Sequence, residues 1–337
     1  MNAQRAASSS SAVLEVRDLA VEFPGHGAAF RPVRGVSLSL ERGQRLGLVG
    51  ESGSGKSLTA LALMRLLPRQ ARIAQGSVML DDRDLVALSE REMTRMRGGR
   101  IAMVYQDPMS SLNPVQTIGH QIAEAIRAHE RVGRNEARGR TIELLRDVGV
   151  THAERRFDSY PHEFSGGMRQ RAMIAMAVCG NPDVLIADEP TTALDMTTQA
   201  RIIDLLDSLV AERGMAVLLI THDLGVAGSF CDAIQVMYAG RIVEAGEALD
   251  VFGHPVHPYT EGLVASICEL DRDVDKPIVT IAGQPPLPQR LPHGCPFHPR
   301  CPAAESVCSE SEPALLQLRG GRRAACHFAD ARLDRTA

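Results

Sequence analysis

The sequence predicts an α/β fold in which a parallel sheet is covered by helices on both faces. Apolar runs of strand length, each bounded by polar or glycine residues, occur at Leu46–Val49, Ile101–Tyr105, Val184–Ala187 and Val217–Ile220. Continuous rather than alternating apolarity is typical of strands that are buried on both faces. Helical patterns, including Leu58–Leu67 and Thr198–Val210, lie between these runs. This alternation of strands and helices indicates a doubly wound sheet.

The four apolar runs lead into residues that can carry chemistry. The residues that follow them are Gly50, Gln106, Asp188 with Glu189, and Thr221 with His222. Open α/β sheets bind ligands at the carboxyl ends of their strands. We therefore expect one site that is assembled from segments far apart in the chain.

The remaining segments suggest how the chain is organised around this core. Apolar and polar residues alternate in places between Val13 and Leu40, which predicts antiparallel strands beside the core. Residues from about 107 to 170 read as a helical subdomain inserted into a domain that covers 13–250. We expect a disordered tail at 1–12 and a C-terminal extension at 251–337, whose stretch Gly283–Pro292 holds four prolines.

Composition narrows the class of protein. The chain has 337 residues, 44% of them hydrophobic and 23% charged, which suits one large globular domain with an extension. A net charge of −4 provides no bulk attraction to nucleic acid, so we expect no nucleic-acid partner. We find neither an apolar run long enough to cross a bilayer nor a signal-peptide core. We therefore expect a cytoplasmic protein whose membrane role comes through partners.

The strongest motif is a glycine-rich loop between a predicted strand and a predicted helix. It reads Gly50-Glu51-Ser52-Gly53-Ser54-Gly55-Lys56-Ser57 and matches the phosphate-binding pattern G-x-x-x-x-G-K-[ST]. Glycines allow the backbone N–H groups to wrap a phosphate chain, and the helix N-terminus adds a positive dipole end. This loop predicts nucleotide binding, with Lys56 at the β- and γ-phosphates and Ser57 at Mg²⁺.

Two further segments fit nucleotide hydrolysis. In Val184–Pro190 an apolar strand ends in two carboxylates, Asp188 for Mg²⁺ and Glu189 as general base for the attacking water. In Phe164–Gln170, the sequence Ser165-Gly166-Gly167 opens a helix and presents N–H groups that can hold an anion. On spacing alone, an ordinary helix N-cap is the more common explanation of Ser165, and only the neighbouring motifs favour the anion site.

Together these motifs resemble the nucleotide-binding subunits of ABC transporters. The phosphate loop, Gln106, FSGGMRQ, VLIADEP, Thr192-Ala193-Leu194-Asp195 and His222 occur in that family's order over residues 13–250. The resemblance implies a P-loop NTPase fold, namely a RecA-like core with an antiparallel β subdomain and a helical subdomain. The chain departs from the common pattern at Leu58 of the ATP site, where many members have Thr, and at Met168, where many have Gln.

The resemblance also implies roles for single residues. Phe23, expected just past the first strand, would stack on adenine. Gln106 would contact Mg²⁺ and couple to a membrane subunit, and His222 would hold the γ-phosphate and water. Ser165, Gly166, Gly167 and Asp195 would act in trans, on ATP that is bound mainly by the opposite subunit.

Further segments are similar to the ATPases of oligopeptide and dipeptide importers. They are Gln106–Pro114, Tyr160–Phe164, His257–Thr260 and the C-terminal GCPFHPRCP with Cys308 and Ala325-Cys326. This similarity implies a second, related ATPase subunit, two transmembrane permease subunits and an extracytoplasmic peptide-binding protein. It places the chain on the cytoplasmic face of the membrane. The alternatives are a nickel or glutathione importer, a regulatory ATPase that senses redox state, and a non-transport ATPase acting on nucleic acid or ribosomes.

Four of the seven cysteines lie close together near the C-terminus: Cys295, Cys301, Cys308 and Cys326. In a reducing cytoplasm such a group indicates metal before disulfide. Four thiolates suit a [4Fe–4S] cluster or Zn²⁺, and no C-x₂-C pair is present. Our first hypothesis for residues 290–328 is one [4Fe–4S] cluster with a structural role. Zinc, with or without His293, His298 or His327, and metal-free reduced thiols remain open.

Overall fold

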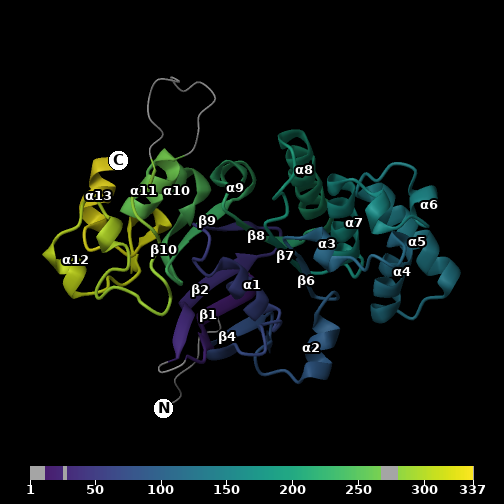
Figure 1. Cartoon of the computed structure of the whole chain (residues 1–337), viewed down its shortest axis with the longest axis horizontal. Coiled ribbons are helices and arrows are strands. Elements are labelled where there is room, and N and C mark those ends of the chain that lie inside the picture. Colours follow the sequence, from purple (N-terminus) through teal and green to yellow (C-terminus); the bar gives the residue numbers. More distant parts are fainter. Residues whose placement is uncertain (1–11, 26–28, 267–279, 337) are drawn as a thin grey trace, which may run out of the picture.

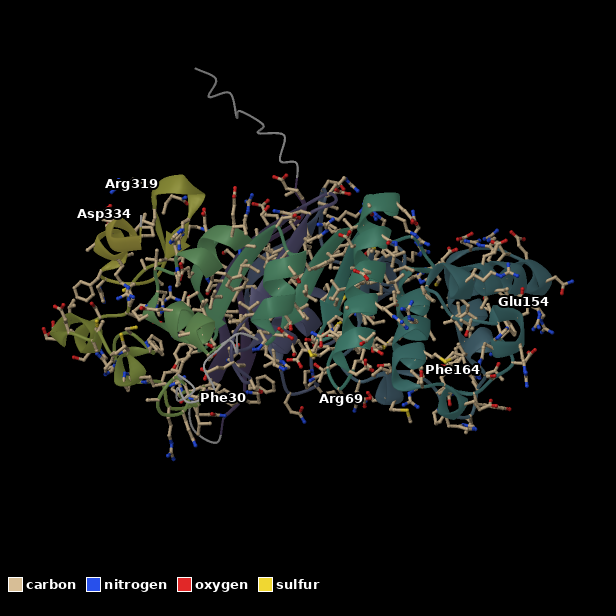
Figure 2. The ribbon with its side chains drawn as sticks, turned by 90° about the horizontal axis from the view of Figure 1, so that it is seen from above. Phe30, Arg69, Glu154, Phe164, Arg319 and Asp334 are labelled. Carbon is tan, nitrogen blue, oxygen red and sulfur yellow. The ribbon has the colours of Figure 1, made fainter. Side chains whose placement is uncertain are left out.

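The computed structural model describes residues 12–25, 29–266 and 280–336. The expected N-terminal tail falls almost wholly outside them, apart from Ala12, which begins the first strand. Figure 1 shows an elongated molecule with a central sheet region, helices α4 to α6 at one end and the C-terminal elements at the other. Figure 2 shows the same separation, with Glu154 at one end and Arg319 and Asp334 at the opposite end.

The strands form two sheets. An eight-stranded sheet has the order β11-β12-β10-β9-β3-β8-β7-β6, and a four-stranded antiparallel sheet has the order β2-β1-β4-β5. The strands are β1 (Ala12–Phe23), β2 (Phe30–Glu41), β3 (Arg45–Val49), β4 (Arg72–Leu80), β5 (Arg83–Asp84), β6 (Ile101–Val104), β7 (Val184–Asp188), β8 (Ala216–Thr221), β9 (Ala233–Tyr238), β10 (Arg241–Glu247), β11 (Leu316–Gln317) and β12 (Arg323–Ala324).

The helices flank the sheets and fill the segment between β6 and β7. They are α1 (Lys56–Leu63), α2 (Glu90–Met96), α3 (Pro108–Ser111), α4 (Ile118–His129), α5 (Arg134–Asp147), α6 (Ala153–Arg156), α7 (Gly166–Val178), α8 (Met196–Arg213), α9 (Leu224–Phe230), α10 (Ala248–Gly253), α11 (Pro258–Ala265), α12 (Ser306–Glu310) and α13 (Ala329–Thr336). Short 3₁₀ turns lie at Pro161–Glu163, His298–Arg300 and Arg319–Gly321.

The central strands are buried on both faces, as their continuous apolarity predicts. Strands β3, β6, β7, β8 and β9 pair in parallel, and every residue of β6, β7 and β8 is buried. Along β8, Val217 and Leu219 join one core cluster, whereas Leu218 and Ile220 join the other. Because neighbouring strand residues point to opposite faces, the sheet separates two cores. One contains residues of α7 and α8, and the other contains residues of α1, β1 and β2.

Helix α1 is shorter than the predicted Leu58–Leu67, since it ends at Leu63. Arg65 adopts a left-handed backbone with φ of 50°. Its N–H donates to Ala62 O at 3.0 Å and the N–H of Leu66 donates to Leu61 O at 2.8 Å, which closes the helix. Glycine usually occupies this position, so an arginine there conceals the helix end from a sequence pattern.

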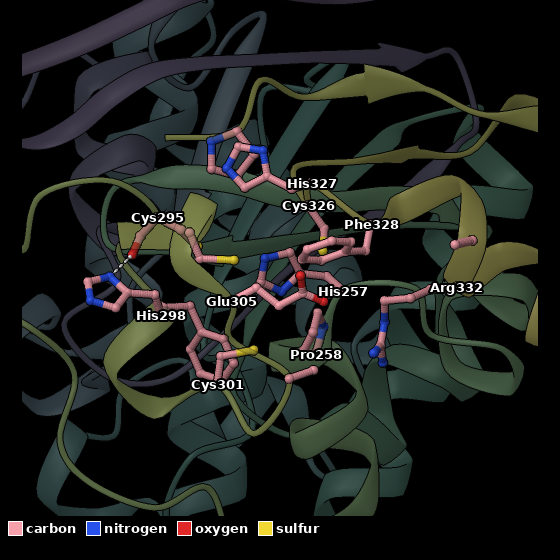
Figure 3. Close-up of a pocket in the computed structure, with 15 residues that line it drawn as sticks. His257, Pro258, Cys295, His298, Cys301, Glu305, Cys326, His327, Phe328 and Arg332 are labelled. Atoms are coloured by element: carbon pink, nitrogen blue, oxygen red, sulfur yellow. Dashed lines mark hydrogen bonds between the residues drawn. The ribbon is translucent and has the colours of Figure 1, made fainter. Parts of the chain in front are cut away.

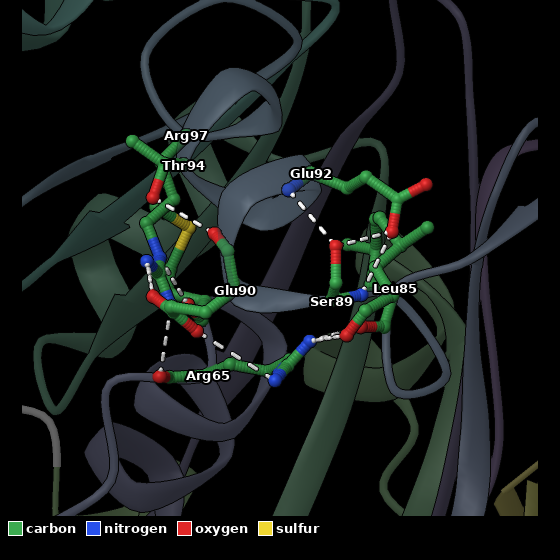
Figure 4. A network of polar contacts seen from close by, with 9 residues as sticks. Arg65, Leu85, Ser89, Glu90, Glu92, Thr94 and Arg97 are labelled. Carbon is green, nitrogen blue, oxygen red and sulfur yellow. Dashed lines mark hydrogen bonds and ion pairs between the residues drawn. The ribbon is translucent and has the colours of Figure 1, made fainter.

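A polar network fixes α2 beside the end of α1 (Figure 4). Ser89 caps α2, with its side chain accepting from Glu92 N–H and the Glu92 carboxylate accepting from Ser89 N–H. Arg65 donates to the carbonyl oxygens of Leu85 and Leu88, and Arg97 donates to Met64 O and to Glu90. These contacts hold the segment that leads into β6.

The C-terminal segment continues the main sheet instead of forming a separate body. Strand β12 pairs antiparallel with β10, and Phe297 and Tyr259 are buried in the main core. The carboxylate of Glu244 on β10, which is fully buried, pairs with Arg322 at 2.7 Å. Phe297 therefore packs in the main core, although it follows the proline-rich stretch 283–292.

Candidate functional site

The phosphate loop connects β3 to α1 and has a backbone that only glycine adopts easily. Gly50, Gly53 and Gly55 have φ values of 149°, 79° and 110°. A Cβ at Gly50 would lie 2.2 Å from Met237 O, and one at Gly55 would lie 2.7 Å from Pro32 O. These close approaches require glycine at both positions. Ser52 and Ser54 lie between the glycines, and Ser54 Oγ is buried with no hydrogen-bond partner among the described residues.

Lys56 begins α1 and is buried under this loop. Its Nζ donates to Gly50 O at 2.7 Å and to Glu51 O at 3.0 Å. Burial lowers the pKa of Lys56, and the nearby carboxylates of Glu189, Asp188 and Glu51 act in the opposite direction. A buried ammonium group that is held by neutral carbonyl oxygens can exchange them for a charged anion, which binds it more strongly. Lys56 is therefore suited to contact a phosphate group.

Ser57 and Asp188 meet at the ends of α1 and β7. Ser57 Oγ donates to Asp188 Oδ1 at 3.1 Å. Burial raises the pKa of Asp188 to about 6, the neighbouring Glu189 adds to that rise, and Ser57 and Lys56 oppose it. A hydroxyl and a desolvated carboxylate are hard oxygen donors, so the pair fits a Mg²⁺ ion. Such an ion supplies positive charge to the phosphates of a bound nucleotide.

Glu189 lies at the centre of the polar residues that follow the strands. Its carboxylate accepts from Gln106 Nε2 at 2.8 Å and from Thr192 Oγ1 at 3.0 Å, and it lies 3.1 Å from His222 Nδ1. Its backbone has a φ of 49°, an unusual value for a residue other than glycine. This strained backbone places the carboxylate at the edge of the sheet where the strands end. Backbone strain of this kind is often found at functional sites. The segments that follow β6, β7 and β8 therefore converge on one carboxylate.

Other residues predicted from the sequence lie apart from this centre. Ser165 is exposed at the start of α7, where its side chain caps the helix by accepting from Met168 N–H. Asp195 caps α8 by accepting from Thr198 N–H at 2.9 Å. A Cβ at Gly166 would lie 3.5 Å from the Leu194 side chain, and one at Gly167 would lie 2.5 Å from the side chain of Thr198 on α8. Within the described residues, this group makes no hydrogen bond to the phosphate loop.

Two predicted residues have neighbours that the sequence does not reveal. Phe23 is the last residue of β1 rather than a residue beyond it, which corrects our expectation. Its ring stacks on Phe30 with 5.5 Å between centroids. Leu58 is partly buried and packs against the core cluster that contains residues of α1.

The sequence reasoning missed two contacts that reach the phosphate loop from beyond residue 250. The N–H of Glu51 donates to Tyr259 Oη at 2.7 Å, and its carboxylate accepts from both terminal nitrogens of Arg300 at 2.7 and 2.9 Å. Arg300 and Glu51 are 249 residues apart. No periodicity or local pattern could have predicted this pair.

The four C-terminal cysteines line one cavity (Figure 3). The cavity measures about 130 Å³, and His257, Phe297 and His298 also contribute to its wall. Burial raises the pKa of the Cys295 thiol to about 11 and also raises the pKa values of Cys301 and Cys326. Within the described residues, no three histidine, cysteine or acidic side chains are close enough together to hold a single metal ion.

The fold and the loop geometry define an ATP-binding cassette, and comparison with known proteins agrees. The ABC transporter family model matches residues 33–192. A dimeric ATP-binding cassette solved in a post-hydrolysis state with ADP and Pi has a TM-score of 0.63 and 27% identity, covering 70% of this chain and 98% of that one. CbiO1 of Clostridium perfringens, part of the cbiONQ ABC transporter complex, has a TM-score of 0.62 and 26% identity, covering 72% of this chain and 90% of its own.

Relatives identify the group within this class. The model for the oligopeptide/dipeptide transporter C-terminal region matches residues 243–308. The "Probable peptide ABC transporter ATP-binding protein y4tR" of Sinorhizobium fredii is 50% identical over 93% of this chain and 94% of its own. The oligopeptide transport ATP-binding protein AppD of Bacillus subtilis is 46% identical over 94% of this chain and 96% of its own. The chain therefore belongs to the ABC transporter ATP-binding subunits, which are ATPases, and to the group with the oligopeptide/dipeptide C-terminal region.

Proposed function

We propose that this chain powers the import of dipeptides or oligopeptides across a membrane. The observation that carries the proposal is the join between the two family regions: Arg300 of the C-terminal segment pairs with Glu51 of the phosphate loop. The ATPase region and the oligopeptide/dipeptide region are thus in direct contact at the phosphate loop. The similarity to AppD and to the peptide transporter protein of S. fredii supports peptide as the cargo.

The site residues divide the hydrolysis of ATP among them. Residues 50–57 wrap the phosphates, Lys56 contacts the β- and γ-phosphates, and Ser57, Asp188 and Gln106 hold Mg²⁺. Glu189 is the general base that polarises the attacking water. His222 holds the γ-phosphate and the water in line, which its 3.1 Å approach to Glu189 supports. Phe23 and Leu58 complete the nucleotide side of the site.

Ser165, Gly166, Gly167 and Asp195 complete the site of a second subunit. Ser165 is exposed and its helix N-terminus is free to meet an anion, whereas its own phosphate loop lies elsewhere. Neither half of such a site stabilises the transferring phosphoryl group alone. ATP therefore closes the dimer and hydrolysis opens it, and this motion passes to the membrane subunits.

The assembly that fits this mechanism contains a second, related ATPase subunit, two transmembrane permeases and an extracytoplasmic peptide-binding protein. The described helices include none of a length and apolarity that would span a bilayer. We place the chain at the cytoplasmic face of the membrane, bound through the permeases. Its domain division is an ABC domain at 13–250, with a helical subdomain at about 107–170, and a C-terminal extension at 251–337.

We propose, further, that the four C-terminal cysteines hold a structural [4Fe–4S] cluster. All four thiols line one cavity, which supports this proposal. A cluster binds each thiolate to a different iron, so it needs four thiols around one central space.

Reconstitution tests the transport proposal. The chain is co-expressed with candidate permeases, and ATPase rates are measured in lipid vesicles with the binding protein and di- or oligopeptides. Peptides should stimulate hydrolysis, and the Glu189→Gln variant should show no stimulation. Stimulation by nickel or glutathione, with none by peptides, would instead assign the subunit to the corresponding importer.

A further inference from the structure

Every N–H donor of the Arg300 side chain has a hydrogen-bond acceptor in the protein. Its side chain is 5% exposed. The Nε donates to Ala282 O at 2.9 Å, one terminal nitrogen donates to Glu51 and Tyr238 Oη, and the other donates to Glu51 and Ile281 O. Because a guanidinium carries five N–H donors, each one has an acceptor here.

Glu51 accepts the two strongest hydrogen bonds of Arg300. It is also the residue through which the rest of the protein holds the phosphate loop in place. The Glu51 N–H donates to Tyr259 Oη, its C=O accepts from Lys56 Nζ, and its carboxylate accepts from Arg300. On either side, Gly50 and the Gly53–Gly55 segment give the loop wide backbone freedom. Two of the three contacts come from beyond residue 250.

We propose that Arg300 is a positioning residue for nucleotide binding: it fixes the phosphate loop through Glu51 and cancels the charge of that carboxylate. A bare carboxylate in the phosphate loop repels the phosphates, and the repulsion is strong in a partly buried site. A loop held in its binding geometry also loses less conformational entropy when the ligand arrives. The C-terminal segment is thus part of the ATP site.

The bidentate geometry explains why arginine stands at this position. The two terminal nitrogens meet the two carboxylate oxygens at 2.7 and 2.9 Å, and the guanidinium lies over the ring of Tyr238, 5.8 Å from its centroid. A lysine supplies charge but no planar fork. Arg300→Lys should therefore retain part of the effect, whereas Arg300→Ala should lose it all.

A mutant cycle on the full-length chain separates charge from packing. Binding of ADP and of a non-hydrolysable ATP analogue is measured by calorimetry for wild type, Arg300→Ala, Glu51→Gln and the double variant. Arg300→Ala should weaken binding about tenfold, which corresponds to about 1.4 kcal/mol. Glu51→Gln should weaken binding less than Arg300→Ala does, because it loses the bidentate contact but leaves no unpaired carboxylate beside the phosphates, and the double variant should bind about as well as Glu51→Gln.

The matched control is Arg319→Ala. Arg319 belongs to the same C-terminal segment and pairs with Asp334, but its side chain is 81% exposed and lies at the far end of the molecule (Figure 2). It should bind nucleotide like wild type. Thermal melting checks the fold of each variant, and Arg300→Gln replaces Arg300→Ala if the latter does not fold.

Two outcomes would overturn the proposal. Wild-type affinity in Arg300→Ala would show that the loop needs no such anchor. A double variant as weak as Arg300→Ala would show that lost packing, and not the Glu51 charge, causes the defect. Neither outcome depends on the transported cargo or on metal in the cysteine cavity, so the transport proposal stands or falls separately.

Discussion

Gln106 Nε2 donates a hydrogen bond to Glu189 Oε2 at 2.8 Å and so joins the end of β6 to the end of β7. Gln106 opens the segment that leads into the helical region beginning at α3, whereas Glu189 follows the strand that carries Asp188. A displacement of the helical region therefore moves a direct partner of the proposed base. If Glu189 acts as proposed, this bond would let the position of that region affect hydrolysis.

Glu189→Gln should retain ATP binding and nearly abolish hydrolysis. Loss of a general base typically lowers the rate about 10²–10⁴-fold, and the amide keeps the size of the side chain. Phosphate release and nucleotide binding are measured on the same preparation. Hydrolysis at the wild-type rate would exclude Glu189 as the base.

Ser165→Arg should leave nucleotide binding by the chain's own phosphate loop intact and prevent ATP-driven dimerisation. Ser165 is exposed, so the added bulk should clash with the phosphates of ATP bound by the partner subunit and should not disturb the core. Gly167→Asp should have the same effect, but its Cβ would also press on Thr198. Light scattering with ATP in the Glu189→Gln background reports the dimer, and Ser208→Arg on α8 is the exposed control. A dimer that forms with both Ser165→Arg and Gly167→Asp would contradict a split site.

Anaerobic purification should yield a brown protein with about four irons per chain. Substituting any one of Cys295, Cys301, Cys308 or Cys326 by serine should lower the iron content, because all four thiols line the cavity. Cys179→Ala, which changes a buried cysteine outside that cavity, serves as the control. A colourless preparation with stoichiometric zinc, or with no metal, would refute the cluster.

Arg322→Ala should destabilise the fold by about 3–5 kcal/mol, because it leaves the buried Glu244 carboxylate without its cation. Glu244 also accepts hydrogen bonds from the N–H groups of Val256 and His257, which lead into α11. An unpaired Glu244 carboxylate should therefore also disturb the start of α11. Urea unfolding measures the change, and Glu244→Gln in the same background should restore part of it. Arg319→Ala, an exposed pair, should cost less than about 1 kcal/mol. Equal losses in the two arginine variants would show that the buried pair is not a major support.

The sequence by itself determined the parallel strands β3, β6, β7 and β8 and the residues that follow them, but not the parallel strand β9. Continuous apolar runs predicted β6, β7 and β8 because burial on both faces favours apolar residues along a strand, and only the last residues of β7 and β8, Asp188 and Thr221, are polar. The polar segments after them converge on Glu189, since carboxyl ends of parallel strands share one sheet edge. The phosphate loop was equally readable, because its backbone geometry demands glycine at fixed spacing.

Only the tertiary structure decided how distant segments meet this core. The pairs Arg300–Glu51 and Arg322–Glu244 join residues far apart in the chain, and ion pairs of this kind leave no period or composition to read. The early end of α1 is set by Arg65 in a left-handed conformation, where the usual glycine signal is missing. Strand β12 joins the main sheet because β10 offers it an unpaired edge, and an edge exists only once the sheet has formed.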